Sequence, residues 1–242
     1  MFRRIAKRLL RTQPEPIQAA ARTLYQEIRL ARAVRHAGRQ FAALDGEKNL
    51  KLHLGCGPEL KSGWINVDLN LNGTVPQIDP GMAPDTKFIL YDLRSGTLPL
   101  ADESCSIIYS SHFLEHLEYQ QGLRLMRDCH RILGPQGTFR AGLPAFRQSF
   151  RKYVDGDHTH FNLYNIYDVL PGLDPATTTL VDHINYGVYQ NGEHKFIYDE
   201  EKICLVLRSL GFGSVNITPY REGLDPPNEL RQRYSFYVEA IK

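Results

Sequence analysis

LHLGCGPEL, at residues 52–60, is the stretch that decides how this chain folds. Its apolar residues indicate a short buried strand, and Gly55 and Gly57 follow directly. Glycine allows a tight turn at a strand end and lets backbone N–H groups approach a ligand without an intervening Cβ. The fingerprint of a nicotinamide dinucleotide site would carry a third glycine where Leu60 stands. The stretch therefore predicts a ligand-binding strand end of a different kind.

The connection to the next strand is unusually short. Nine residues separate this strand from WINV at 64–67, whereas a crossover between parallel strands normally needs about 10 to 12 or more. The first helix is therefore expected to be nearly absent, and with it the helix dipole that would face a pyrophosphate. Asp68 follows the second strand. Its two oxygens suit the two hydroxyls of a ribose, and a turn or helix cap is the alternative role.

Strands and helices alternate from residue 50 onward. This order predicts an α/β domain with a mainly parallel sheet covered on both faces, and the helix-free link before the final strand predicts that this strand is antiparallel. Strands are expected at 50–54, 64–67, 87–91, 106–110, 137–143, 214–218 and 234–241, and helices at about 117–133 and 199–210.

The segment 147–195 is rich in aromatic residues, His, Asn and Pro, and it lacks sustained periodicity. We interpret it as an insertion at the carboxyl edge of the sheet, where open α/β sheets bind their ligands. The domain itself is expected to span 46–242.

Positive charge is concentrated in the N-terminal arm, residues 1–45. This arm carries ten Lys and Arg against three Asp and Glu, and the rest of the chain carries nineteen against twenty-four. No nucleic-acid partner is therefore expected for the folded domain. Apolar residues at helical spacing predict a short basic helix at 2–11 and a longer one at 17–43. Three roles are open for the arm: packing on the domain or on a second subunit of a homodimer, peripheral contact with an anionic membrane, or organelle targeting.

The cysteines and the hydropathy pattern bear on location. Four widely spaced cysteines, at 56, 105, 129 and 204, form no C-x-x-C pair and are interpreted as reduced thiols. No apolar run approaches the roughly 18 residues of a membrane span. A cytoplasmic protein is predicted, lying at the inner face of the membrane if the arm binds lipid.

Five motifs in this order resemble the class I, Rossmann-like S-adenosylmethionine-dependent methyltransferases of the type 11 kind. They are LHLGCGP (52–58), NVDL (66–69), YDL (91–93), LPLADESCSIIYSSHFLEHL (98–117) and HRILGPQGTFRAGLP (130–144). The resemblance covers roughly residues 50–242 and implies a Rossmann-like open seven-stranded sheet with S-adenosylmethionine as cofactor. Two departures stand out: Cys105-Ser106 replaces a common Phe-Asp, and GPQG at 134–137 replaces the commoner Lys-Pro-Gly-Gly.

The resemblance also assigns cofactor contacts, residue by residue. It places the glycine turn under the methionine part, the acidic residue after the second strand at the ribose, the one after the third strand at the adenine, and the end of the fourth strand beside the transferable methyl. The residues concerned are Gly55, Cys56, Gly57, Asp68, Leu69, Asp92, Leu93 and Ser110.

The catalytic candidates lie in SSHFLEHL, residues 110–117. If the acceptor is a hydroxyl, a positioned base is needed, and His112 or His116 is predicted to serve. The alternative is that Glu115 and His116 cap or pack the helix that begins there. No metal site is predicted, although H-x-x-E-H at 112–116 spells the inverted zinc-protease signature, because zinc would need a third ligand and a different scaffold. The ligand-like cluster at 155–160 has a spacing that suits a turn.

Four residues are predicted to contact the acceptor: His158, His194, Lys195 and Tyr198. The last three would face an anionic group, with Asp199 as an N-cap of the following helix as the alternative reading of this stretch. The main hypothesis is methyl transfer to a small or saccharide-like acceptor, walled by the insertion. The shortened crossover and the ending at 193–212 resemble bacterial enzymes of glycan and cell-envelope biosynthesis. The competing hypothesis is a catalytically silent relative that serves as a binding or scaffold protein.

Overall fold

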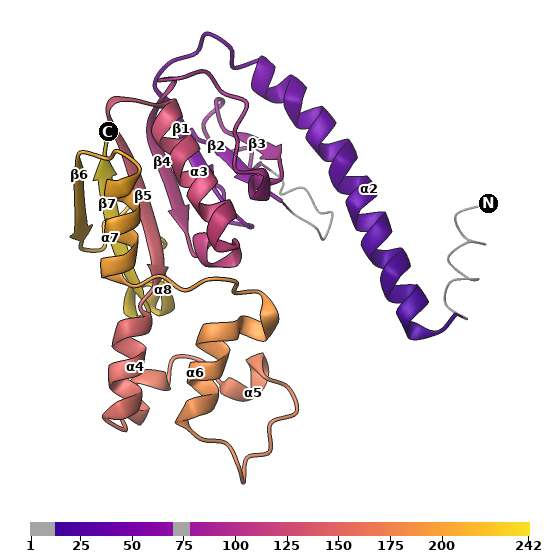
Figure 1. The fold of residues 1–242 in the computed structure, drawn as a ribbon, viewed down its shortest axis with the longest axis vertical. Coiled ribbons are helices and arrows are strands. Elements are labelled where there is room, and N and C mark those ends of the chain that lie inside the picture. The colour runs from indigo at the N-terminus through magenta and orange to yellow at the C-terminus, as the bar shows by residue number, and fades with distance from the viewer. Residues whose placement is uncertain (1–12, 70–77) are drawn as a thin grey trace.

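The computed structural model describes residues 13–69 and 78–242 and contains a seven-stranded sheet (Figure 1). The strands are β1 (Leu50–Leu54), β2 (Ile65–Asp68), β3 (Lys87–Leu90), β4 (Cys105–Ser111), β5 (Leu133–Pro144), β6 (Ser214–Thr218) and β7 (Ser235–Ile241). The helices are α2 (Glu15–Ala42), α3 (Tyr119–Ile132), α4 (Phe146–Val154), α5 (Ile166–Val169), α6 (Leu180–Tyr189), α7 (Glu200–Ser209) and α8 (Glu229–Arg233). Short 3-10 turns are η1 (Leu93–Ser95), η2 (Leu114–His116), η3 (His158–Phe161) and η4 (Gln190–Gly192).

The strand order is β3-β2-β1-β4-β5-β7-β6. The first five strands pair in parallel, and β7 runs antiparallel to both β5 and β6. The predicted fold class, a Rossmann-like mainly parallel sheet with an antiparallel final strand, is therefore confirmed. Residues 55–64, between β1 and β2, contain no helix, as predicted from the short length of this connection. The order reverses between β1 and β4, and this switch point is where open α/β sheets form a ligand crevice.

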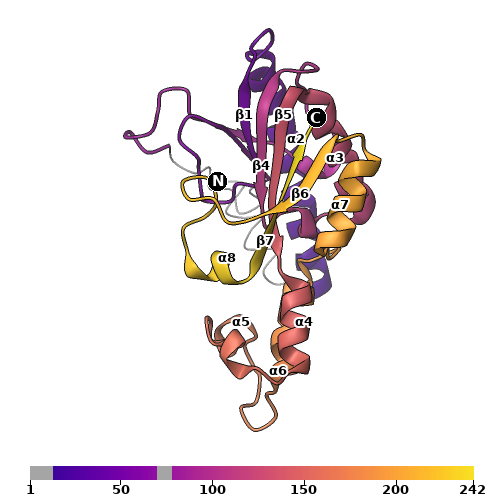
Figure 2. The same ribbon diagram turned by 90° about the vertical axis from the view of Figure 1, so that its left-hand side faces the viewer.

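One predicted boundary and one predicted layer differ from the structure. Strand β5 begins at Leu133, because Leu133 pairs with Cys105 before an irregularity shifts the register to Ile107–Thr138. Helices α3 and α7 lie on the same side of the sheet, whereas the short α8 and several loops lie on the other (Figure 2). Within residues 13–69 and 78–242, long helices thus do not cover both faces of the sheet, and the abbreviated first crossover is one reason.

Helix α2 is part of the fold at its C-terminal end. Ala37 and Phe41 are buried, Phe41 packs edge-on against Tyr91 with ring centroids 5.3 Å apart, and Gln40 Nε2 donates to Phe88 O. The other end extends away from the sheet (Figure 1), where Leu24 is 62% exposed. The predicted helix at 2–11 lies outside the described residues. No helix in the described ranges is both long enough and apolar enough to cross a membrane.

The insertion, expected to lack periodic structure, forms a small helical unit of α4, α5 and α6 beyond the end of β5 (Figure 1). Aromatic contacts hold it together: Phe161 packs on His183 at 5.2 Å and Tyr164 packs on Tyr186 at 5.7 Å. The helices are short, from four to ten residues, which explains why no sustained periodicity marks them in the sequence.

Candidate active site

The glycine loop after β1 is folded back onto β2. Gly55 N donates to Val67 O at 2.9 Å, and Gly57 N donates to Asp68 Oδ2 at 2.5 Å. Both glycines have positive φ, +65° and +53°. A Cβ on Gly57 would meet no described atom within 4 Å, so this loop borders open space. A Cβ on Gly55 would instead overlap the ring of Phe113, which ties the loop to the segment that follows β4.

Asp68, at the end of β2, holds the loop and is partly exposed. Burial raises the pKa of its carboxyl group, while hydrogen bonds from the backbone of Gly57 and Leu69 and the nearby His116 act in the opposite direction. A carboxylate has about four lone-pair sites, so these two bonds leave acceptor capacity for ligand hydroxyls. The turn-cap and ribose roles are therefore compatible in one side chain.

Asp92 follows β3 and is already paired. Its Oδ1 accepts from Arg94 N and Nε at 3.0 and 2.8 Å, and its Oδ2 accepts from Arg94 Nη2 at 2.9 Å. Leu93 is buried in the core, as is Cys56, where burial strongly raises the pKa of the thiol. An adenine contact at Asp92 stays a prediction, and it would have to be shared with this arginine.

The end of β4 carries Ser110 and His112. Ser110 is buried, and its hydroxyl has no hydrogen-bond partner within the part of the chain that the structure describes. His112 adopts φ +48°, its N donates to Gly142 O at 2.9 Å, and its Nε2 lies 2.6 Å from Ser235 Oγ. Burial lowers the pKa of His112 well below its usual range, helped by Arg231 and two neighbouring histidines. The imidazole is therefore neutral at physiological pH, and one ring nitrogen keeps a lone pair.

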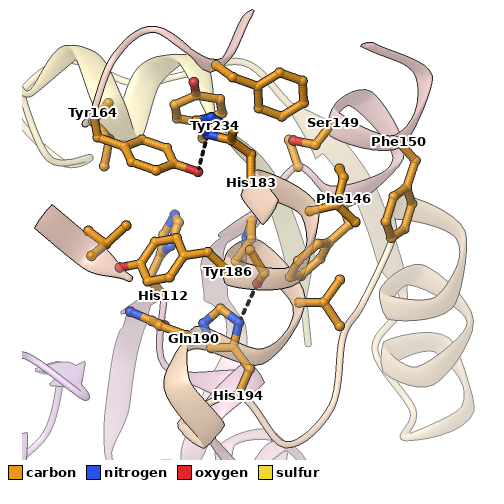
Figure 3. Close-up of a pocket in the computed structure, with 18 of the residues that line it drawn as sticks. His112, Phe146, Ser149, Phe150, Tyr164, His183, Tyr186, Gln190, His194 and Tyr234 are labelled. Carbon is orange, nitrogen blue, oxygen red and sulfur yellow. Dashed lines mark hydrogen bonds between the residues drawn. The ribbon is translucent and has the colours of Figure 1, made fainter. Parts of the chain in front are cut away.

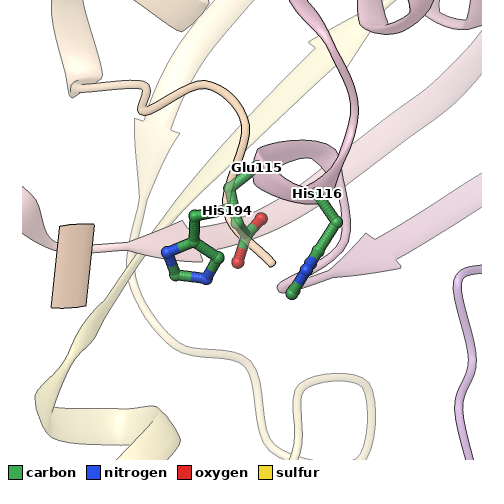
Figure 4. A group of neighbouring side chains, drawn as sticks. All are labelled: Glu115, His116 and His194. Carbon is green, nitrogen blue, oxygen red and sulfur yellow. The ribbon is translucent and has the colours of Figure 1, made fainter. Parts of the chain in front are cut away.

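Beside His112 lies a cluster of Glu115, His116 and His194 (Figure 4). Burial raises the pKa of Glu115 to about 8, and it lowers the pKa of both His116 and His194. The Glu115 carboxylate is fully buried, with Oε1 3.5 Å from His112 Nδ1. Segment 193–196 is brought to this place by two backbone hydrogen bonds to Glu115 O, from Lys195 N at 2.7 Å and Phe196 N at 3.2 Å. The structure thus joins three predicted site residues with Glu115.

A cavity of about 290 Å³ opens next to His112 (Figure 3). It lies between the end of the sheet and the insertion, and its wall is mostly aromatic. Its polar lining atoms come from side chains such as Ser149, His183 and Gln190. Its main aromatic members are Phe146, Phe150, Phe161, Tyr164, Tyr186 and Tyr234. An aromatic pocket with a few polar groups is the usual form of a small-molecule site.

Of the four predicted acceptor contacts, His194 lines this cavity. His158 is exposed and borders a second hollow, which shares Phe161, Tyr164 and His183 with this cavity. Lys195 is exposed, and its Nζ donates to Gly192 O at 2.5 Å. Tyr198 is only 1% exposed and packs in the core against Phe196, so the structure places it away from the cavity. Asp199 is the N-cap of α7, accepting from Lys202 N, as the alternative reading predicted.

The part of the chain that carries this geometry is similar to known proteins. Residues 52–141, from β1 to β5, match the family model described as a methyltransferase domain. This part of the chain is a methyltransferase domain. The family implies S-adenosylmethionine as cofactor. No curated protein sequence matches the chain.

Two solved structures are among those similar to the chain. An S-adenosylmethionine-dependent methyltransferase from Archaeoglobus fulgidus is 15% identical, with a TM-score of 0.46, over 90% of this chain and 94% of that one. A methyltransferase of the same description from Methanosarcina mazei is 16% identical, with a TM-score of 0.46, over 81% of this chain and 93% of that one.

The residues of this methyltransferase domain fit the cofactor. The open space at Gly57 is a cradle that a side chain would fill, and Asp68 retains acceptor capacity for a ribose. The unpaired hydroxyl of Ser110 lies at the same sheet edge. Gly55, Gly57, Asp68 and Ser110 would hold S-adenosylmethionine in this geometry, and these contacts stay predictions like the other assigned ones.

One part of the cavity wall was not predicted from the sequence. Residues 229–235, with Arg231, Tyr234 and Ser235, reach the cavity or His112 from the other end of the chain. No motif marks them, because their role depends on how β7 pairs with β5. The aromatic wall of the insertion was signalled only by composition.

Proposed function

We propose that this methyltransferase domain methylates a hydroxyl group of a small, saccharide-like acceptor bound in the cavity beside His112. The observation that carries the proposal is the position of His112, which lines the cavity and also belongs to the sheet edge that carries the cofactor residues. The aromatic rings of Phe146, Tyr164 and Tyr186 offer flat apolar faces to a sugar ring, and nearby side chains offer hydrogen bonds to its hydroxyls. The resemblance to glycan and cell-envelope enzymes makes envelope precursors the first acceptors to test.

The chemistry required of the chain is modest. S-adenosylmethionine supplies a methyl group on a positively charged sulfur, so that the acceptor oxygen gains the carbon, the C–S bond breaks and the sulfur keeps the electron pair. The chain holds acceptor and donor together, which contributes about 7 to 11 kcal/mol when the alignment is good. His112, neutral through burial, takes the proton that the acceptor hydroxyl loses. Ser235, 2.6 Å from Nε2, fixes the orientation of the ring.

Two measurements test the proposal. Calorimetric titration with S-adenosylmethionine and S-adenosylhomocysteine, with NAD as control, should show saturable binding of the first two only. Turnover is then screened by mass spectrometry on nucleotide sugars and lipid-linked saccharides. His112→Gln should lower kcat by roughly 10² to 10⁴-fold with cofactor affinity unchanged. Cofactor binding with no methylated saccharide, or a His112→Gln enzyme with full kcat, would refute the acceptor class or the base respectively.

A further inference from the structure

We propose that Glu115, His116 and His194 form a binding site for a divalent transition-metal ion such as Zn²⁺. One ligand atom of each residue lies within 4.8 Å of the others. Figure 4 shows the carboxylate of Glu115 beside the two imidazole rings, which pack edge to face with their centroids 4.9 Å apart. The site goes beyond the proposed methyl transfer and rests on it only for its suggested use.

The buried carboxylate is the first reason. Glu115 has no exposed side-chain surface, and neither of its oxygens accepts a hydrogen bond from any residue in the ranges 13–69 and 78–242. Burial of a polar group without a partner is costly, and buried charges are normally paired or coordinate a metal. Its Oε1 lies 3.5 Å from His112 Nδ1 without a hydrogen bond to it, so a cation shared with His116 and His194 would give the carboxylate a closer partner.

The orientation of the imidazoles is the second reason. His194 Nδ1 lies 2.7 Å from Gly187 O, and a carbonyl can only accept, so Nδ1 carries the proton and Nε2 keeps a free lone pair. Histidines that bind metals are typically oriented in this way, through their other ring nitrogen. Two backbone hydrogen bonds to Glu115 O place His194 here, although 78 positions separate it from His116. His194 thus joins Glu115 and His116 of the H-x-x-E-H stretch, whereas His112 lies outside the proposed ligand set.

The donor set selects the metal. Two imidazoles and one carboxylate, with a position left open, form a set that catalytic zinc sites use. Mg²⁺ prefers oxygen ligands and is disfavoured by two nitrogens. Bonds of about 2.0 to 2.2 Å in a tetrahedron separate ligand atoms by roughly 3.4 Å. The ligand atoms lie within 4.8 Å of one another, so side-chain rotations that bring the most distant pair closer by up to about 1.4 Å would reach this value. The neighbouring cluster at 155–160 is different, because Asp157 is already engaged by Thr159 and Lys152.

The position of the site suggests its use. His194 lines the acceptor cavity, and His116 lies close enough to Asp68 to affect its pKa. A metal ion here would sit between the acceptor and the cofactor crevice. A hydroxyl oxygen of the acceptor in the open position would be fixed toward the donor, and its proton would be more readily lost to His112.

Metal binding is tested directly on the full chain. The protein is dialysed against a chelator and titrated with Zn²⁺, Co²⁺ or Mg²⁺ alone, with calorimetry, elemental analysis and the visible Co²⁺ spectrum as readouts. We expect one Zn²⁺ per chain and a tetrahedral Co²⁺ spectrum, with no Mg²⁺ binding at equal concentration. Glu115→Gln and His194→Gln should each weaken Zn²⁺ binding at least tenfold. His183→Gln, a histidine of the same cavity outside the cluster, should bind as the wild type does.

The measurements distinguish loss of the metal site from loss of folding and from failure of the proposed function. Circular dichroism and S-adenosylmethionine binding, measured on each variant, show whether it is folded. A wild type that takes up no Zn²⁺, that prefers Mg²⁺, or whose Zn²⁺ binding survives both cluster substitutions would overturn the metal site. Cofactor binding in the same chelated samples reports on the proposed function independently, so that either proposal can fail while the other stands.

Discussion

The contact between Gly55 and Phe113 gives a sharp test of how the cofactor loop is held. Gly55→Ala places a methyl group into the Phe113 ring and also forces alanine into a left-handed conformation, φ +65°. Gly57→Ala is the matched control, because φ is +53° and a Cβ there meets no described atom within 4 Å. The two variants therefore share the backbone strain, and they differ in the steric overlap.

The magnitudes follow from these two terms. Left-handed strain costs about 1 to 2 kcal/mol for each alanine. Overpacking against Phe113 adds roughly 1 to 3 kcal/mol at position 55 alone. The smaller entropy of the unfolded chain offsets about 0.4 to 1 kcal/mol in both variants and cancels in the comparison. Gly55→Ala should thus lower the free energy of unfolding by about 1 to 3 kcal/mol more than Gly57→Ala, because the overpacking cost is the only term that differs.

The assay is urea unfolding without cofactor, followed by circular dichroism and by fluorescence of Trp64, the single tryptophan. Phe113→Ala, combined with each glycine variant, completes a double-mutant cycle. We expect a favourable coupling of about 1 to 3 kcal/mol for positions 55 and 113, and less than about 0.5 kcal/mol for 57 and 113. Equal urea midpoints for the two glycine variants, or equal couplings, would refute the packing argument.

Three further predictions concern single residues. Asp68→Ala should weaken S-adenosylmethionine binding by roughly 1 to 3 kcal/mol, measured by calorimetry, because ribose hydroxyls lose their acceptor; unchanged affinity would remove Asp68 from the site. Burial, with Lys61 nearby, lowers the pKa of His53 in the folded protein to about 3. Below a pH of about 6.5, the pKa of an unfolded histidine, the unfolded state therefore binds more protons than the folded state. The free energy of unfolding should fall as the pH falls. Urea unfolding should lose about 2 kcal/mol from pH 7 to 5 through this group, a loss absent in His53→Gln. Tyr198→Phe should unfold at the same or a higher urea concentration, since the buried hydroxyl has no hydrogen-bond partner in the described structure. If the variant instead raised the KM for the acceptor, Tyr198 would belong to the substrate site.

The sheet was predictable because its signals are local. Strands such as SVNIT at 214–218 and the helix at 200–209 carry their periodicity in a few adjacent residues, and their predicted positions agree with the structure within a residue or two. The start of β5 was missed because it depends on the pairing of Leu133 with Cys105 in another strand. The helices of the insertion were not predicted from the sequence. They are short and their apolar residues face one another, so none of them carries a long apolar stripe with helical spacing.

The candidate site, like the fold, has residues whose place follows from the sequence and residues whose place depends on tertiary contacts. The glycine loop and Asp68 are marked by strand-end chemistry, and the structure brings them together at one edge. Tyr198 shows the limit of position along the chain as evidence. It lies four residues after His194, yet it points into the core while His194 reaches the cavity. Direction within an irregular segment depends on its contacts, and the sequence does not state them.

Glu115 shows why a motif needs a fold before its chemistry can be judged. In the sequence, H-x-x-E-H offered two meanings, a helix start or an incomplete metal site. The structure uses the backbone of Glu115 to anchor the segment 193–196, and by that anchoring it brings His194 to the Glu115 side chain. A residue that only capped a helix would gain nothing from a fully buried carboxylate that, within the described residues, accepts no hydrogen bond and has His112 Nδ1 3.5 Å away, and the burial would cost stability. The arrangement is explained if the carboxylate is kept for a ligand, which makes the metal titration the measurement that separates the two meanings.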